Sequence, residues 1–250
     1  MEFTTIARAK KQTGLSYLGS VSKTVKHKKS LKYGEMTYSL YLSPANTSGY
    51  EVCPGRTAEC TRFCLNESGM NKMVRKVKGD VINDSRIKKT RLFFEHREFF
   101  MKWMIAEIAT ANRKAQDLGY TFSVRLNNTS DISPLDFRLG EENILEIFPN
   151  TKFYDYTKVR DRISLPKKYP NYDLTFSYTG HNWNTSQEML KSKINVAVVF
   201  KTVPASYNQY EVIDGDRYDM RYMDKKGVIV GLKFKQVRNK LNSNVKFVVQ

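Results

Sequence analysis

Residues 36–45 read MTYSLYLSPA, in which polar residues alternate with large apolar ones up to a Ser-Pro pair. This alternation of β-forming residues is typical of a strand. Five later short runs are also rich in β-forming residues: Tyr120–Leu126, Thr151–Thr157, Asp173–Gly180, Ile194–Phe200 and Gly227–Phe234. The helix-compatible stretches EENILEIF, VRDRISLPKKY and TSQEMLKS lie between them. Strands joined by crossovers of this length predict an α/β fold with about six mostly parallel strands.

A long helical stretch is expected between the first two strands, from about Asn71 to Leu118. Its apolar residues, Phe99 and Trp103 among them, recur at steps of three and four, which is the helical period. Gly119 ends the pattern, and the Gly79-Asp80 pair is expected to divide the stretch into two helices.

The first 33 residues differ in composition from the rest. They carry eight Lys or Arg against one acid, Glu2, and the whole chain has a net charge of +17. We interpret residues 1–33 as a flexible basic N-terminal arm and residues 34–250 as a single α/β domain. Such a charge attracts phosphates, so nucleic-acid binding through the arm is one interpretation, and a solubilising tail is the other.

Nothing in the sequence predicts a membrane partner. The longest apolar run, Ile194–Phe200, is too short to span a bilayer, and the N-terminus lacks the apolar centre of a secretory signal. The expected location is therefore the cytoplasm, where thiols stay reduced.

All three cysteines, Cys53, Cys60 and Cys64, lie within twelve residues, in the sequence CPGRTAECTRFC. In a reducing compartment such a cluster indicates a metal or catalytic site more than a disulfide framework. Three soft thiolates on one loop suit a cubane [4Fe–4S] cluster with one iron that no cysteine ligates. Zinc completed by a distant histidine and three unligated thiols are the alternatives.

Polar residues follow four of the expected strands at their carboxyl ends, where parallel α/β folds build their sites. The cysteine cluster follows the first strand. Arg125 and Asn127 follow the second, Lys158 the third and His181 the fourth. We expect these four residues to bind a polar ligand or cofactor beside the cysteines. The alternatives are an ordinary helix-capping turn for the Arg125 segment and solvent exposure for Lys158.

A second distinctive stretch, VIDGDRYDMRYMDKKG (residues 212–227), is rich in aspartate but does not fit the spacing of an EF-hand loop. We expect a charged turn in which Asp214, Asp216 and Asp219 pair with nearby Arg and Lys residues. The other two histidines, His27 and His96, are expected to have surface or core roles.

The motifs CPGRTAECTRFCLN and VIDGDRYDMRYMDKKGVIVGLKFK, together with RLNNTSDI and FYDYTKV, resemble the bacteriophage proteins of the gene product 88 type over about Tyr38 to Lys235. Members of that group look like distant relatives of radical S-adenosylmethionine enzymes. The resemblance implies a partial (β/α) barrel, a [4Fe–4S] cluster on Cys53, Cys60 and Cys64, and S-adenosylmethionine as a ligand. The spacing here is C-x6-C-x3-C, whereas radical S-adenosylmethionine enzymes typically have C-x3-C-x2-C.

Three functional hypotheses follow from these observations. The first is a phage-encoded iron–sulfur protein, acting as a redox or radical enzyme in the host cytoplasm. The second is a nucleic-acid-binding protein with a structural metal site. The third is a virion or assembly protein with a redox-inert cluster, whose partners are phage virion proteins.

Overall fold

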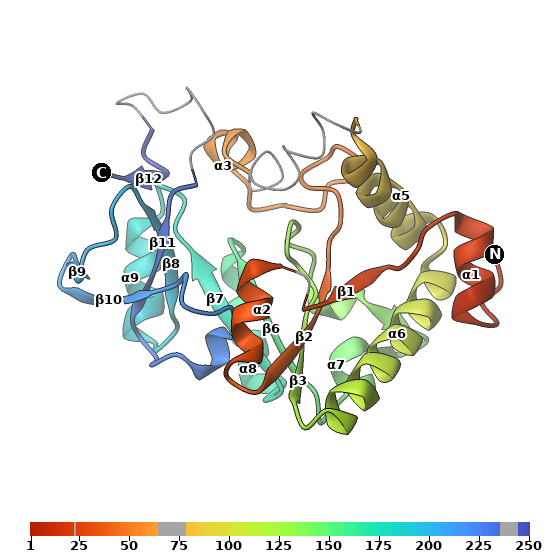
Figure 1. Ribbon diagram of the computed structural model, residues 1–250. Coiled ribbons are helices and arrows are strands. Elements are labelled where there is room, and N and C mark those ends of the chain that lie inside the picture. Colours follow the sequence, from red (N-terminus) through yellow and green to blue (C-terminus); the bar gives the residue numbers. More distant parts are fainter. Residues whose placement is uncertain (23, 65–78, 236–244) are drawn as a thin grey trace.

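The computed structural model describes residues 1–22, 24–64, 79–235 and 245–250. Its centre is a ten-stranded sheet with the order β1-β2-β3-β6-β7-β8-β11-β10-β9, and β12 pairs with β8 on the edge away from β11 (Figure 1). The strands of this sheet are β1 (Gly19–Val21), β2 (Glu35–Leu40), β3 (Thr121–Arg125), β6 (Lys152–Thr157), β7 (Tyr172–Ser177), β8 (Val196–Phe200), β9 (Ser206–Tyr207), β10 (Tyr210–Asp214), β11 (Ile229–Lys233) and β12 (Val248–Val249). A separate hairpin joins β4 (Arg138–Leu139) to β5 (Glu142–Asn143).

The fold is mixed α/β with a largely parallel sheet, as the sequence predicted. Every pairing from β2 to β10 along the sheet is parallel, and all six expected strands are present. Only the two ends, β1 on β2 and β9 on β10, pair antiparallel. No pairing between described residues closes the sheet into a barrel, so β1 and β9 remain its edges.

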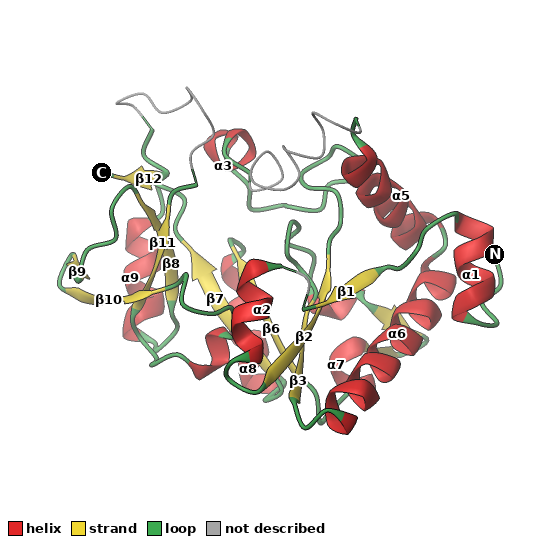
Figure 2. Cartoon of the chain, in the orientation of Figure 1, coloured by secondary structure: helices red, strands yellow, loops and turns green. Residues whose placement is uncertain are grey.

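The helices come between the strands as crossovers or lie before the sheet (Figure 2). They are α1 (Ile6–Thr13), α2 (Val25–Leu31), α3 (Ala58–Arg62), α5 (Val81–Glu95), α6 (Arg97–Asp117), α7 (Ile144–Ile147), α8 (Leu165–Lys168) and α9 (Trp183–Lys191). The expected long helical stretch is α5 and α6, broken at His96, whose φ of −136° and ψ of 55° are not helical. α5 begins directly after Gly79-Asp80, and residues 71–78 of that prediction lie outside the described part of the chain.

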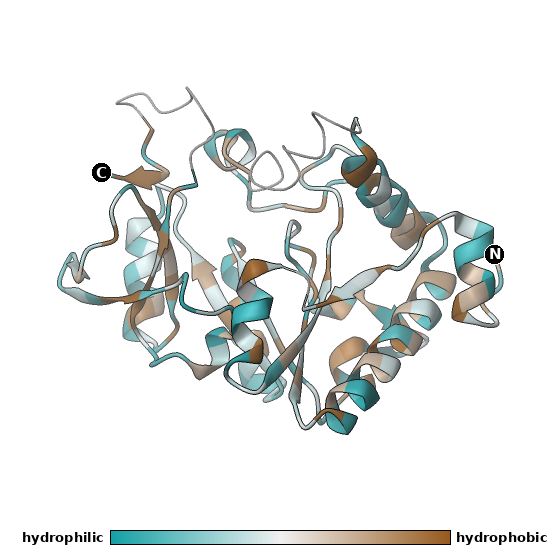
Figure 3. Cartoon of the chain, in the orientation of Figure 1, coloured by the Kyte–Doolittle hydropathy of each residue, from teal (hydrophilic) through white to brown (hydrophobic). Residues whose placement is uncertain are grey.

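Two apolar clusters pack the crossover helices onto the sheet. The larger joins α5 and α6 to β2, β3 and β6, and its centre contains the fully buried Phe93, Phe100 and Trp103. The smaller joins α9 to β8 and β11, whose apolar residues are brown in Figure 3. Burial of large aromatic side chains at this scale supplies the dominant favourable term in folding.

Over β2, β3, β6 and β7 the opposite face of the sheet, called the inner face below, is polar although it is buried. Its strand residues are Thr37, Ser39, Ser123, Arg125, Tyr154 and Thr175. Parallel sheets are usually apolar on both faces, so this alternation is a departure from the common pattern. Helix α2 and the 215–224 segment cover this face, and α2 lies in front of the sheet in Figure 1.

The N-terminal 33 residues are not the flexible arm that their charge predicted. Ala9, Leu15 and Leu18 join the larger apolar cluster, β1 pairs with β2, and His27 of α2 is 1% exposed. The segment is amphipathic: its described lysines are exposed, whereas Ala9, Leu15 and Leu18 are buried. Charge counting alone missed this because it ignores where the apolar residues fall. No helix in the described ranges has the length and apolarity needed to cross a membrane.

Candidate functional site

The cysteine loop (residues 53–64) lies at the carboxyl edge of the sheet, as the order of strands predicted. Val52, which is fully buried, anchors it: its N–H donates to Ala45 O (3.0 Å), and its carbonyl accepts from Asp131 N (2.7 Å). Because Asp131 belongs to the loop after β3, these bonds fix the start of the cysteine loop to the neighbouring strand end.

The thiol of Cys53 is held by two hydrogen bonds. Its Sγ accepts a bond from Ala45 N (3.4 Å) and donates to Thr129 O (3.8 Å). Burial raises the pKa of Cys53 to about 12, and the nearby Cys64, Asp131 and Cys60 raise it as well. Cys53 is therefore a neutral thiol near pH 7 unless a cation is placed beside it.

Cys60 and Cys64 lie on and just after the short helix α3. The Thr57 side chain caps this helix by accepting from Cys60 N (3.1 Å). Between the two cysteines Phe63 is buried against the C-terminal segment, with its ring centroid 6.3 Å from that of Phe247. Glu59 of α3 accepts from Phe247 N (2.7 Å) and so ties the helix to the same segment.

The three thiols share one neighbourhood and are all half-buried. As a donor set they fit a soft metal or an iron–sulfur cluster, which binds thiolates and would offset the burial that keeps Cys53 protonated. Their sulfurs do not converge on one point: among the described residues no three His, Cys, Asp or Glu side chains are arranged to hold a metal ion.

Lys158 lies against the cysteine loop. A Cβ added at Gly55 would be 2.8 Å from Lys158 Cβ and 3.0 Å from its carbonyl carbon, so only glycine allows this approach. Lys158 N donates to Asp131 Oδ2 (2.9 Å), and Thr157 Oγ1 donates to Asp131 Oδ1 (2.8 Å). Arg162 completes the arrangement with a 2.6 Å bond to Asp131 Oδ1. Asp131 thus joins the ends of β3 and β6 beneath the cysteines.

His181 follows β7 and faces α3. Its Nε2 lies 4.0 Å from Glu59 Oε1, and its side chain is 53% exposed. The preceding Gly180, at φ +90°, lies so close to Lys246 that an added Cβ would be 2.5 Å from that residue's carbonyl carbon. The structure therefore brings Lys158 and His181 to the cysteine loop, as expected from their positions after parallel strands.

The polar groups of the other two expected ligand residues are engaged with other residues of the chain. Asn127 is buried in the loop after β3, where Nδ2 donates to Ile132 O (3.0 Å) and to Asp155 Oδ2 (3.1 Å). Arg125 points to the inner face and donates from Nη1 to both carboxylate oxygens of Asp219 (3.0 and 2.8 Å). Their hydrogen bonds hold loops and elements together.

A buried polar cluster on the inner face was not expected from the sequence. His27 Nε2 lies 3.0 Å from Asp219 Oδ2, Tyr154 OH donates to the same oxygen (3.0 Å), and Ser39 Oγ lies 3.1 Å from His27 Nδ1. Asp219 does pair with a cation, but the partner is Arg125, 94 residues away, and not a neighbouring residue of the expected charged turn. No local signal marks His27, since it sits in a lysine-rich run and meets Asp219 192 residues away.

Together these observations define a class: a mixed α/β protein whose parallel strands follow one another in nearly sequential order and carry a three-cysteine loop at their carboxyl edge. The chain belongs to the bacteriophage gene product 88 family, whose model matches residues 8–248. The family resemblance read from the two motifs is thereby confirmed. Neither the curated proteins nor the solved structures contain a significant match to the chain.

Proposed function

We propose that the chain binds a [4Fe–4S] cluster through Cys53, Cys60 and Cys64. The observation that carries the proposal is the shared, half-buried neighbourhood of three thiols at the carboxyl edge of a parallel sheet. Sequential parallel strands support a partial barrel comparable to that of radical S-adenosylmethionine enzymes. When bound, a cluster of this kind supplies one-electron transfer and, at an iron without a protein ligand, a position for a small ligand.

The chain's own residues beside this site have separate tasks in the proposal. Lys158 and His181 provide cationic and hydrogen-bonding groups next to the cysteine loop, which suits a carboxylate-bearing ligand such as S-adenosylmethionine. Asp131 holds the ends of β3 and β6 in place. Arg125 and Asn127 keep their neighbouring elements together and do not contact the ligand.

The test is anaerobic reconstitution with iron and sulfide, followed by measurement of colour and of iron per protein. We expect a brown protein with about four iron atoms per chain. Each of Cys53→Ala, Cys60→Ala and Cys64→Ala should lower the iron content, while His96→Gln, remote in sequence from the loop, should not. A colourless protein that retains one zinc per chain under the same conditions overturns the proposal in favour of a zinc site.

The ligand part of the proposal has its own measurement. S-adenosylmethionine should change the electron paramagnetic resonance spectrum of the reduced, loaded protein, and Lys158→Ala or His181→Ala should weaken the response. Arg125 is not a suitable target because its removal leaves buried Asp219 without its main cation. A spectrum that does not respond in the wild-type protein assigns the site an electron-transfer or structural role.

A second candidate function is nucleic-acid binding, and the observation that favours it is the ordered display of lysines on α2. Lys28 on this helix and Lys32 at its C-cap are exposed, while Lys29 Nζ donates to Asp216 O (2.7 Å). α2 is largely hydrophilic in Figure 3. The net charge of +17 provides long-range attraction to phosphates.

Fluorescence anisotropy with a labelled oligonucleotide at several salt concentrations tests this candidate. Lys28→Gln with Lys32→Gln should weaken binding and reduce the slope of log K against log salt by about 0.7 for each single-strand phosphate that the variant no longer neutralises. Lys114→Gln with Lys102→Gln on α6 removes the same charge from another face. If the two double variants weaken oligonucleotide binding equally, the effect comes from net charge and the α2 surface is not a specific binding site.

A further inference from the structure

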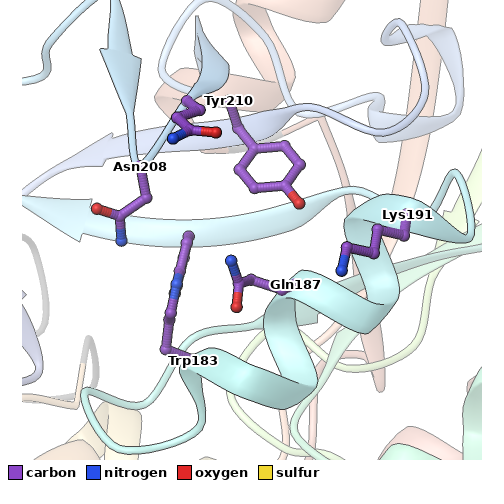
Figure 4. Close-up of a pocket in the computed structure, with 6 residues that line it drawn as sticks. Trp183, Gln187, Lys191, Asn208 and Tyr210 are labelled. Atoms are coloured by element: carbon purple, nitrogen blue, oxygen red, sulfur yellow. The ribbon is translucent and has the colours of Figure 1, made fainter.

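A pocket of about 610 Å³ lies between α9 and the β9–β10 hairpin, away from the cysteine loop. It is lined by Trp183, Gln187, Lys191, Asn208, Gln209 and Tyr210. Figure 4 shows the first three rising from α9 and facing Asn208 and Tyr210 of the hairpin. The volume falls in the range of small-ligand sites.

The α9 wall is a stripe of residues at helical spacing. Trp183, Gln187 and Lys191 follow one another at intervals of four, so their side chains lie on one face of the helix. This stripe offers an aromatic ring, an amide and an ammonium group in that order along the helix. The half-buried ring of Trp183 is held by edge contacts with Tyr178 (5.7 Å), Tyr207 (5.2 Å) and Tyr210 (6.3 Å) between ring centroids.

The hairpin wall is a tight two-residue turn. Tyr207 pairs with Tyr210, and the residues between them, Asn208 and Gln209, have φ of 48° and 71°. Two consecutive positive φ values match a type I′ turn, in which the second position usually holds glycine. Gln209 occupies it at a conformational cost that glycine would avoid, and so it adds a second side-chain amide beside the pocket.

The polar groups of the pocket have no competing partners in the described part of the chain. The side chains of Gln187, Lys191, Asn208 and Gln209 form no hydrogen bond or ion pair there. The acids nearest in sequence are neutralised: Glu188 pairs with Arg160 (2.7 Å) and Glu211 with Lys225 (2.5 Å). The ammonium of Lys191 is therefore the available charge at this wall.

We propose that this pocket binds a nucleotide unit, with its base on the ring of Trp183, its base edge on the amides, and its phosphate on Lys191. Aromatic rings stack on bases, and side-chain amides provide the paired donors and acceptors that base edges match. Lys191 and the +17 net charge favour a phosphate-bearing ligand over a neutral saccharide. The proposal is independent of the iron–sulfur site, and it adds a base contact to the second candidate function.

Intrinsic fluorescence provides a site-specific readout. The chain has two tryptophans, and Trp103 is fully buried, so quenching by an added ligand reports on Trp183. We expect a short oligothymidylate to quench the wild-type protein. Thymidine monophosphate distinguishes a free-nucleotide site, where it also quenches, from a single-strand site, where only the oligonucleotide does. Quenching by chitobiose without quenching by either nucleotide probe overturns the proposal.

Variants then locate the binding surface by anisotropy of a labelled oligothymidylate, with circular dichroism as the check on folding. Trp183→Leu should weaken binding about tenfold, as expected for the removal of one base stack. Lys191→Gln should weaken it more than Lys193→Gln, which removes the same charge from an exposed lysine outside the pocket.

The α2 variants, measured in parallel, separate the two nucleic-acid proposals. If the Lys28 and Lys32 changes lower affinity while Trp183→Leu and Lys191→Gln do not, the pocket proposal fails and the α2 surface stands. If only the pocket variants act, the α2 surface fails. If the wild-type protein binds no oligonucleotide and is not quenched by either nucleotide probe, both fail.

Discussion

Burial controls the chemistry of single residues on both sides of the sheet edge. Cys53 is a thiol whose pKa is raised to about 12, chiefly because burial disfavours the thiolate. Asp155, 1% exposed beneath the same edge, has its pKa raised to about 7, again chiefly by burial. Both groups therefore stay neutral up to a pH well above that at which an ordinary cysteine or aspartate ionises.

In the reduced, metal-free protein we expect Cys53 to be alkylated slowly. At pH 8 a thiol with pKa near 12 is about 10⁻⁴ thiolate, against about 0.2 for an ordinary cysteine. N-ethylmaleimide labelling followed by peptide mass spectrometry measures this, with urea-unfolded protein as the control. Equal labelling rates of Cys53 in the folded and unfolded protein would contradict the assignment.

Asp155 makes stability depend on pH. Its pKa is higher in the folded protein than in the unfolded chain, so its stabilising contribution is complete below about pH 4 and is lost as pH rises to about 7. Between these pH values the free energy of unfolding should fall by at most about 1.4 kcal/mol per pH unit. Urea unfolding of the wild type and of Asp155→Asn between pH 4.5 and 7.5 measures this. The decline should appear only in the wild type. If the unfolding free energies of the two proteins change in parallel with pH, the expectation is contradicted.

At the scale of elements, Asp219 joins α2 and the 215–224 segment to the inner face of the sheet. It accepts bonds from Arg125 of β3 and Tyr154 of β6, and it lies 3.0 Å from His27 of α2. A buried carboxylate with several partners is stable only while its charge is compensated. The attachment of the covering elements therefore includes a buried polar contact whose charge must stay compensated.

Removing the compensating cation should cost more than removing one hydrogen bond that a neutral hydroxyl donates to the same carboxylate. Arg125→Ala leaves Asp219 buried with reduced compensation and should lower the free energy of unfolding by about 3–5 kcal/mol. Tyr154→Phe removes one hydrogen bond from a neutral hydroxyl to the carboxylate and should cost about 1.5–3 kcal/mol. Urea unfolding at pH 7 gives both values. A similar cost for the two changes would argue against Asp219 as a buried charge.

At the scale of the whole molecule, the N-terminal segment completes the fold. β1 covers one edge of β2, α2 covers the inner face, and Leu18 is fully buried in the larger core. The described Lys and Arg residues of the segment do not change this, because their side chains are exposed. Charge and structural role are therefore separable in this segment.

Deletion of residues 1–33 should destabilise the entire chain. It exposes β2 as an edge strand and uncovers the polar inner face, so we expect aggregation or loss of the cooperative thermal transition. The Lys28→Gln, Lys32→Gln variant should instead retain the wild-type melting temperature within a few degrees. A truncated protein that melts like the wild type would restore the interpretation as a flexible arm.

The six central strands and the edge at which the cysteines lie were determined by local sequence. Their alternating β-forming residues and the helical period between them act within a few residues of one another, so pattern reading detects them. The same order placed Lys158 and His181 beside the cysteine loop. Gly55 and Gly180 allow the close approach of the chain segments there. The need for glycine is seen only in their contacts with Lys158 and Lys246, respectively.

What only the tertiary structure decided are the contacts between residues far apart in the chain. His27 meets Asp219 across 192 residues, and Arg125 meets the same carboxylate across 94, so it faces the inner side of the sheet. The lysine-rich N-terminus is folded because its scattered apolar residues find partners on α6 and β2. Such pairings depend on how the sheet twists and on which segment covers it. Local hydrophobic periodicity in the sequence does not indicate these long-range contacts.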